Sequence, residues 1–274
     1  MMIPFNVIVP VRNEEVQLQS TAPALKASLT GLPVTVTYVL NATTDASRAV
    51  IESVFGHTAC IIELPHAGKA NALRAADASV RGNLIVYLDA DIVVTKDTFP
   101  ALLHPLIEGH ADFVAARLVV DLSQSLGFAL RVGRVWGDQL ARRPDAFMCC
   151  TAINENGLKQ RGPWPDVLAD DDWARNRIDP SRRMIIEAAK AYMTPPLNLL
   201  SWVKVRARWI CGTRQLKNMG ENFNPGEKIM PRGSVIDLAA YYIVRLSAEL
   251  LALIWQHRQS YWSRDNSSRR KNCV

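Results

Sequence analysis

Two carboxylates separated by one residue follow an apolar run in the first third of the chain. The run covers residues 84–88, and Asp89 and Asp91 come directly after it. Such a run predicts a buried strand, and the carboxyl end of a strand is where open α/β sheets place their ligands. Mg²⁺ and Mn²⁺ take oxygen ligands, typically one or two carboxylates together with substrate phosphate oxygens. The spacing suits a divalent cation that carries phosphates, although Asp-x-Asp alone is also common in solvated loops.

A polar turn at residues 10–15 follows another short apolar run. In a doubly wound fold this turn would face a nucleotide. It contains no Gly-x-Gly-x-x-Gly sequence, and the chain has no Walker-type loop, so the dinucleotide fingerprint and the P-loop are excluded. By itself the turn is better explained as the polar start of a helix.

A second turn holds Asn41 and Asp45, after an apolar run at 34–40. An amide offers both a donor and an acceptor, so Asn41 could pair with the edge of a base. Asp45 is better placed to cap the helix expected at 47–55.

Lys69 follows Gly68 at the start of an alanine-rich helix expected at 69–80. Exposed backbone N–H groups, a flexible glycine and a cation together favour an anion. An ordinary solvated lysine is the alternative.

Three consecutive acids, Asp170, Asp171 and Asp172, offer carboxylates that could accept a proton. The alternative is an acidic first turn of a helix, which the helix dipole favours. Trp164 and Trp173 flank the cluster, where each could stack on a sugar face or, as the simpler interpretation, pack in the core.

The elements that must position these residues alternate between strand and helix through the first 110 residues. This alternation predicts an α/β fold with a mostly parallel sheet flanked by helices. We expect a catalytic domain at 1–215, with a nucleotide-binding half at 1–110 and an acceptor-binding half at 111–215, followed by a helical extension at 216–274. In the second half we expect a strand at 113–120, a helix at 126–142, a strand or short helix at 184–192 and a helix from 195 to 217.

The composition is that of a globular protein with a sizeable core, since 49% of the 274 residues are hydrophobic and 21% are charged. The five cysteines show no metal-ligand or disulfide spacing, and no secretory signal opens the chain, so a reducing cytosol is expected. Much of the net charge of +6 lies at the C-terminus, in Arg258, Arg264, Arg269, Arg270 and Lys271 against Asp265. Such a tail is a solvated end or a contact with a membrane surface; no nucleic-acid-binding module accompanies it.

The longest apolar stretch, at 235–255, is interrupted by Asp237, Arg245 and Glu249. At about 100° per residue these three fall within an arc of roughly 120°, which predicts an amphipathic helix with a wide apolar face. Two interpretations stay open: the helix packs on the core of its own domain, or it lies in the plane of a membrane surface.

Taken in order, these motifs resemble those of the family 2 glycosyltransferases, which have a GT-A fold. The match extends to Asp170-Asp171, where the family has Glu-Asp, and to Arg208-Trp209, where it has Arg-Trp. It covers roughly residues 3–215 and includes the segments 9–15, 41–45, 68–73 and 89–91.

The resemblance implies a role for each motif. Asp91 would bind Mn²⁺ or Mg²⁺, and Asp89 would support the metal or the nucleotide. Asp171 is the favoured general base, since Arg177 follows it at the usual spacing, and Asp170 is second. The residues implied in nucleotide binding are Pro10, Val11, Arg12, Glu14 and Asn41, with Lys69 beside the nucleotide, Arg208 on the diphosphate and Arg206 as a second candidate.

The sequence also departs from the family pattern. Asn41 replaces the usual Asp, Arg12 stands where Tyr is common, and Val205 replaces the Gln of processive synthases. The transmembrane helices of those synthases are missing too, which favours transfer of one sugar per acceptor.

We therefore expect a metal-dependent, inverting hexosyltransferase that uses a UDP-linked sugar. Its acceptor would be a cell-surface glycan or a lipid-linked glycan, and its location the cytoplasm or the inner face of the plasma membrane. The alternatives are a sugar nucleotidyltransferase, which usually has a Gly-rich loop that this chain lacks, and a non-catalytic domain that binds a nucleotide sugar.

Overall fold

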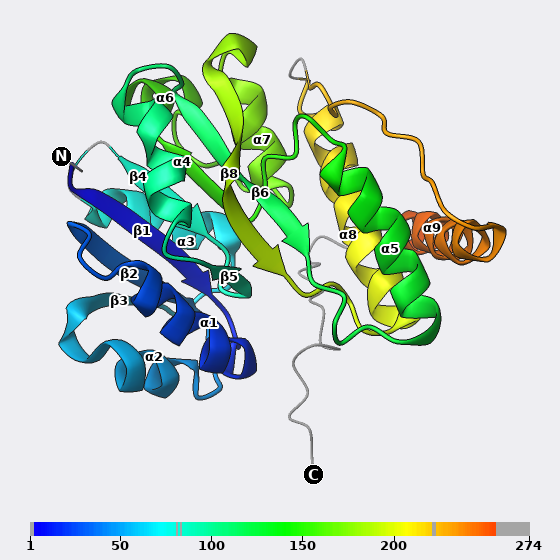
Figure 1. Cartoon of the computed structure of the whole chain (residues 1–274), viewed down its shortest axis with the longest axis horizontal. Coiled ribbons are helices and arrows are strands. Elements are labelled where there is room, and N and C mark those ends of the chain that lie inside the picture. Colours follow the sequence, from blue (N-terminus) through cyan, green and yellow to red (C-terminus); the bar gives the residue numbers. More distant parts are fainter. Residues whose placement is uncertain (1–2, 81, 83, 221–222, 256–274) are drawn as a thin grey trace.

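The computed structural model describes residues 3–80, 82, 84–220 and 223–255, and these form one mixed sheet with helices on both faces (Figure 1). The strands are β1 (Phe5–Val11), β2 (Val34–Asn41), β3 (Ala59–Leu64), β4 (Ile85–Leu88), β5 (Ile92–Val94), β6 (Phe113–Val120), β7 (Cys150–Ile153) and β8 (Arg183–Met193). The α-helices are α1 (Glu15–Ser28), α2 (Ser47–Phe55), α3 (Lys69–Ser79), α4 (Thr98–Ile107), α5 (Gly127–Ala141), α6 (Glu155–Arg161), α7 (Asp170–Arg177), α8 (Leu199–Asn218) and α9 (Val235–Trp255).

The sheet has the strand order β3-β2-β1-β4-β7-β6-β8-β5. Strands β3, β2, β1 and β4 are parallel, as the alternation of strand and helix predicted. In the second half β7 runs antiparallel to β4 and β6, β5 runs antiparallel to β8, and only β6 and β8 are parallel. The carboxyl ends of β1, β2 and β4 consequently meet at one edge of the sheet.

The central strands are apolar on both faces because helices cover both faces. Val7 and Val86 belong to a large core cluster beneath α1, α2, α4 and α5, whereas Ile8 and Tyr87 face a second cluster with α3 and α7. Continuous apolar runs, rather than alternating ones, are the sequence signature of such strands.

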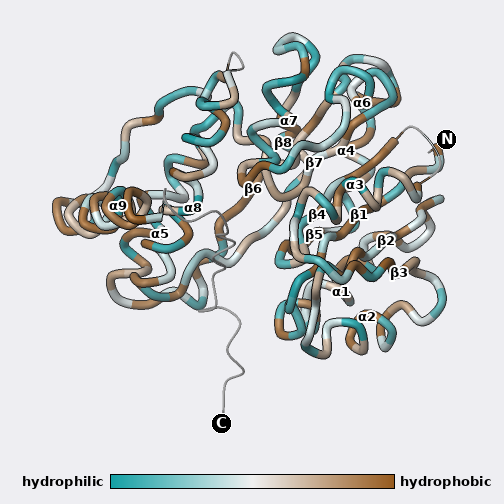
Figure 2. Tube along the Cα trace, turned by 180° about the vertical axis from the view of Figure 1, so that it is seen from behind, coloured by the Kyte–Doolittle hydropathy of each residue, from teal (hydrophilic) through white to brown (hydrophobic). Residues whose placement is uncertain are grey.

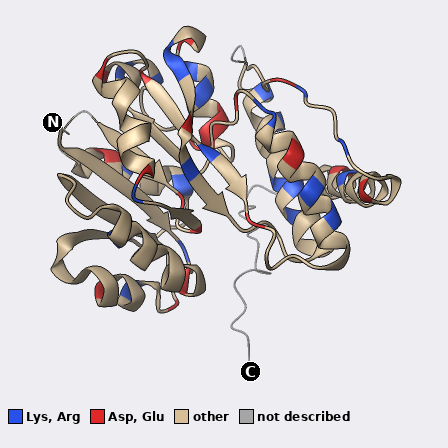
Figure 3. Ribbon diagram, viewed as in Figure 1, with Lys and Arg blue, Asp and Glu red and all other residues tan. Residues whose placement is uncertain are grey.

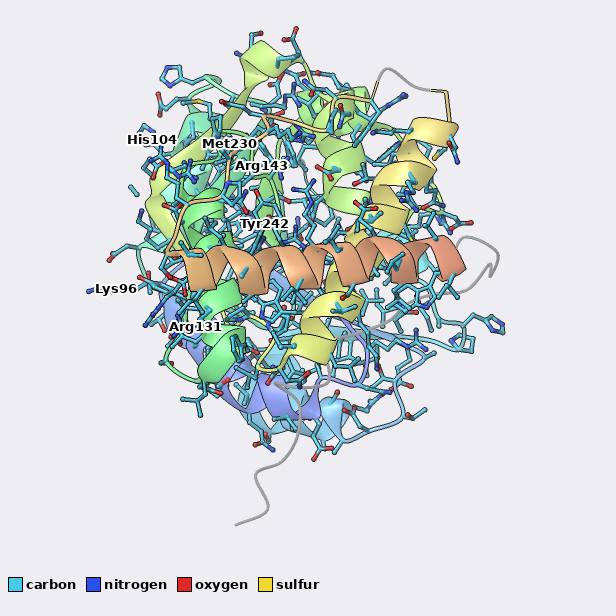
Figure 4. All side chains as sticks on the ribbon, turned by 90° about the vertical axis from the view of Figure 1, so that its right-hand side faces the viewer. Lys96, His104, Arg131, Arg143, Met230 and Tyr242 are labelled. Carbon is cyan, nitrogen blue, oxygen red and sulfur yellow. The ribbon has the colours of Figure 1, made fainter. Side chains whose placement is uncertain are left out.

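Helices α5, α8 and α9 form a layer beside the sheet, in which α9 crosses the other two (Figure 4). Tyr241 and Val244 of α9 are buried in the large core cluster, and Ala248 and Ala252 pack on α8. Among the described residues, α9 is the one helix long and apolar enough to cross a membrane by length and composition.

The predicted elements are confirmed with shifts of a few residues at their ends, and the segment at 184–192 is a strand, β8. The domain boundary expected after residue 215 falls within the last turn of α8. The basic C-terminal tail lies outside the described residues.

Candidate active site

A small cavity lies at the edge where β1 and β4 end, and residues far apart in the sequence meet around it. Five of the predicted site residues line it: Pro10, Lys69, Asp89, Asp170 and Asp171. The rest of the lining is Leu73, Tyr87, Leu88, Cys149, Thr151, Trp164 and Ala174. Asp89 and the acidic cluster, about 80 residues apart in sequence, therefore belong to one site.

The Asp-x-Asp turn is held by backbone hydrogen bonds on both sides. The Asp89 N–H donates to the Cys149 carbonyl at 2.8 Å, and the Asp89 carbonyl accepts from the Ile92 N–H at 3.2 Å. The Thr21 hydroxyl donates to the Ala90 carbonyl at 2.7 Å. Asp89 and Asp91 are both partly buried, so their carboxylates stand on a fixed turn at the sheet edge.

Lys69 links the two acidic groups of the site. Its ammonium lies 2.9 Å from Asp89 Oδ1 and 2.8 Å from Asp170 Oδ2. Burial by itself lowers the pKa of Lys69, but the surrounding carboxylates, Asp170 foremost, outweigh burial and raise it well above its usual value. The side chain is therefore a cation at neutral pH.

Asn41 fixes the segment that leads into Lys69. Its side chain is buried, and its Oδ1 accepts a hydrogen bond from the Gly68 N–H at 3.0 Å. Because the last residue of β2 is thereby tied to the first turn of α3, the amide positions Lys69. A role for Asn41 in recognising the base stays a prediction.

The first two polar turns are joined by hydrogen bonds through Asp45. Its carboxylate accepts from the Glu15 N–H at 3.0 Å and from the Ser47 N–H at 3.0 Å. The Glu14 N–H donates to the Ser47 hydroxyl at 2.9 Å. Glu14 and Val11 are buried here, while Pro10 and Arg12 are partly exposed. Asp45 therefore bonds to the start of α2, as its position predicted, and also joins the two polar turns.

The three acids of the cluster all lie in the first turn of α7, yet each has different surroundings. Asp170 pairs with Lys69, and Asp172 lies 3.2 Å from the Arg175 guanidinium. Burial raises the pKa of Asp171 well above its usual value, and the neighbouring acids add to this effect while Lys69 opposes it. A carboxylate with a raised pKa accepts a proton more readily, which suits Asp171 as a base.

The two arginines of α8 lie on different faces of the helix. The Arg206 Nη2 lies 3.2 Å from the Tyr241 hydroxyl, and its guanidinium lies 4.8 Å from the centre of that ring, so it contacts α9. Arg208 is one helical turn before Gly212, whose face packs so closely on Ala169 that an added Cβ would lie 2.9 Å from the Ala169 Cβ. Residues four apart share a helix face, so Arg208 lies on the side of α8 that faces the start of α7.

The two tryptophans pack in the core, as the simpler interpretation predicted. Trp164 and Trp173 are each 5% exposed, and their rings are 5.6 Å apart. Trp164 also lines the cavity, and the buried Arg161 guanidinium stacks on it at 4.3 Å.

Two buried arginines near the site were not predicted from the sequence. Arg161 pairs with Asp77 at 2.7 Å, across 84 positions of the chain, and no local pattern indicates that pair. Arg175 pairs with Asp145 at 2.9 Å and contacts Asp172 three residues earlier. The second contact has the spacing of a helix-surface pair, so the sequence did carry a signal for it.

The carboxylates fit a metal that is shared with a substrate. No group of three or more His, Cys, Asp or Glu side chains is placed to hold a metal among the residues that the structure describes. A metal that arrives with phosphates needs only one or two carboxylates from the protein. The Lys69 ammonium between Asp89 and Asp170 shows that this position attracts a cation. Asp91 and Asp89 would hold such an ion.

The sequence matches the family model described as Glycosyl transferase family 2 over residues 6–143. That match covers half of the chain, so the protein belongs to glycosyl transferase family 2. Among curated proteins no sequence matches this chain.

Solved structures show that the fold is GT-A. The mannosyltransferase PcManGT from Pyrobaculum calidifontis, in complex with GDP-Man and Mn²⁺, matches with a TM-score of 0.62 and 20% identity over 94% of this chain and 76% of that one. S. aureus TarS 1–349, in complex with UDP-GlcNAc, matches with a TM-score of 0.58 and 12% identity over the same shares. M. tuberculosis glucosyl-3-phosphoglycerate synthase matches with a TM-score of 0.50 and 16% identity over 76% of this chain and 79% of that one.

Proposed function

We propose that this glycosyltransferase is an inverting, metal-dependent hexosyltransferase that moves one sugar from a UDP-linked donor to a hydroxyl of a cell-surface or lipid-linked glycan. The observation that carries the proposal is the meeting of Asp89, Lys69 and Asp171 around one cavity at the carboxyl ends of the parallel strands. The donor diphosphate requires a carboxylate to hold its metal, and the acceptor hydroxyl requires one as a base. Asp89 and Asp171 would supply them from opposite halves of the chain.

Inverting transfer needs a base on the acceptor and charge neutralisation on the departing diphosphate. Asp171 takes the proton of the acceptor hydroxyl as its oxygen attacks the anomeric carbon and the bond to the diphosphate breaks. Lys69 and Arg208 supply positive charge to the leaving group. When bound by Asp91 and Asp89, Mn²⁺ or Mg²⁺ would neutralise the diphosphate further.

The donor can be identified from its effect on thermal stability. Ligands that bind only the native state raise Tm, and at about 100 times Kd a chain of this size should gain about 5 °C or more. We expect UDP and UDP-sugars with Mn²⁺ to give the largest shift, measured against GDP, ADP and their sugars with and without Mn²⁺.

Two outcomes of this screen, each followed by an activity assay, would overturn the proposal. A larger shift with a nucleoside triphosphate, together with pyrophosphate release in the presence of a sugar phosphate, identifies a nucleotidyltransferase. Binding of a UDP-sugar with neither transfer nor slow hydrolysis identifies a non-catalytic binding domain.

The orientation of α9 supports a location on a membrane surface. Its acids turn toward the protein, where Asp237 pairs with Arg131 at 2.9 Å and Glu249 pairs with Arg214 at 2.9 Å. The opposite face is apolar and exposed. Figure 2 shows the hydrophobic residues along α9. Its exposed side chains include Val235, Ile236, Tyr242, Ile243, Leu246, Leu250, Leu253 and Ile254. Ordinary surface helices of soluble proteins have the reverse arrangement.

A bilayer surface fits this face better than a transmembrane position. Leaving the domain to cross a membrane would separate both ion pairs and expose Tyr241 and Val244, which belong to the core. Lying in the plane of the interface keeps these contacts and buries the outer face in acyl chains. The basic residues that follow α9 in the sequence would attract anionic headgroups.

Charges on the outer face of α9 should abolish membrane binding. In a flotation assay with vesicles that contain anionic lipid, the native protein is expected to float, whereas the double variant Leu246→Glu and Leu250→Glu should lose at least about tenfold in bound fraction, because carboxylates resist burial in acyl chains. The control, Gln19→Glu and Ser53→Glu, adds the same charge on exposed positions of α1 and α2, at the opposite end of the molecule (Figure 1).

The outer face of α9 could instead contact a second copy of the chain, and gel filtration coupled to light scattering tests this alternative. The alternative predicts that the native protein dimerises and does not float, and that the double variant is monomeric. These results together would show that α9 binds a second copy of the chain and not a membrane.

A further inference from the structure

Lys69 occupies the position where the donor-side and acceptor-side carboxylates approach each other. Its side chain is 19% exposed, and its two partners, Asp89 and Asp170, are 29% and 10% exposed. The residue opens α3, so its backbone is fixed by the helix and by the Asn41 bond to Gly68. One internal cation is therefore shared by the two carboxylates, and it neutralises one of their two negative charges.

This internal cation competes with a metal ion. A divalent ion on Asp89 would lie close to the Lys69 ammonium, and like charges at short range repel strongly in a partly buried site, where water and salt screen them weakly. Asp91 belongs to the same short turn, so an ion that it shares with Asp89 would meet the same charge. Metal alone should consequently bind weakly, although the turn supplies suitable oxygen ligands.

A diphosphate removes the conflict, because it brings acceptors for both cations. The first turn of α3 presents backbone N–H groups, and the N-terminus of a helix favours an anion. Lys69 can then exchange Asp89 for a phosphate oxygen and leave the carboxylate to the metal.

We propose that Lys69 is an internal counter-ion that holds Asp89 until a nucleoside diphosphate arrives, so that metal and nucleotide bind together and neither binds tightly alone. This inference rests on the proposed function for the identity of the nucleotide and the metal. Coupling of this kind is reciprocal: the nucleotide raises metal affinity by the same factor as the metal raises nucleotide affinity.

Electron paramagnetic resonance of free Mn²⁺ measures the coupling without any sugar transfer. For the native protein we expect weak binding of Mn²⁺ alone and a gain of at least about tenfold on addition of UDP. In Lys69→Met, Mn²⁺ alone should bind at least about tenfold more tightly than in the native protein, and the gain from UDP should shrink. Equal affinity of Lys69→Met and the native protein for Mn²⁺ alone would overturn the proposal.

Matched variants separate this effect from simpler ones. Lys159→Met removes the same charge from the exposed surface of α6 and should leave Mn²⁺ affinity unchanged. Lys69→Arg keeps the cation and should bind Mn²⁺ alone as weakly as the native protein. If Lys69→Met does not fold, Lys69→Met with Asp170→Asn removes both partners of one ion pair, and it should bind Mn²⁺ more tightly than Asp170→Asn alone.

The binding measurement also distinguishes failure of this inference from failure of the proposed function. Tighter Mn²⁺ binding by Lys69→Met in a protein that transfers no sugar would support the counter-ion and refute the activity. Sugar transfer by the native protein, with unchanged Mn²⁺ binding in Lys69→Met, would support the activity and refute the counter-ion.

Discussion

Asp171→Asn is expected to lower kcat by about 10²–10⁴-fold, because asparagine keeps the size of the side chain but cannot take the proton of the acceptor. Donor affinity should change little, since the change leaves Asp89, Asp91 and Lys69 in place. Transfer of labelled sugar from the donor selected by thermal shift to a solvent extract of membranes measures the rate.

The neighbouring acids provide the controls for this assignment. Asp172→Asn should keep most of the activity, because that carboxylate is engaged by Arg175. Asp170→Asn breaks the ion pair with Lys69, so its effect should fall on donor and metal binding more than on kcat. Near-normal turnover in Asp171→Asn, with loss of kcat in Asp170→Asn, would move the base to Asp170.

Asp91→Ala is expected to lower transfer by at least about 10³-fold, because the metal that we propose to neutralise the diphosphate would lose its main protein ligand. The fold should be intact, since the turn is held by backbone bonds of Asp89 and Ala90. The same variant should lose the part of the UDP-induced Tm shift that depends on Mn²⁺, which a thermal-shift titration measures.

Asp97→Ala is the matched control, since it removes an exposed carboxylate six residues away at the start of α4. It should keep both the activity and the Mn²⁺-dependent shift. Turnover close to that of the native protein in Asp91→Ala would refute the metal-ligand assignment.

The first half of the fold was predictable because its central strands, β1 and β4, are buried on both faces. Each central strand reads as a continuous apolar run, and polar residues appear where the strand ends, as at Asn41 and Asp89. Local periodicity then suffices to place the elements and the site edge. The second half lacks this signal: β7 has four residues, and β6 pairs with β8 some 70 positions away with an irregularity after Ala116.

The side chains of the site were predicted by type but not by partner. The sequence indicated Lys69 and Asp89 beside a nucleotide and Asp170 as the second candidate for the base. The ion pairs that join them depend on how the fold brings α3, α7 and the end of β4 together. The charged arc of α9 was predicted as well, but periodicity does not say which side of a helix meets the protein. That side is decided by Arg131 and Arg214, which lie on α5 and α8. Figure 3 shows basic residues on both of these helices.

The inner face of α9 has a consequence for how this enzyme can evolve or be engineered. Tyr241 and Val244 share one core with Val132 and Trp136 of α5. The helix that would bind the bilayer therefore also forms part of the hydrophobic core of the domain. Deleting α9 to gain solubility would expose this core to water and destabilise the fold. Loss of the helix during evolution would have the same cost. A more soluble form of the enzyme should therefore be sought by replacing the exposed apolar residues of the outer face with polar ones, one helical turn at a time, while α9 itself is kept.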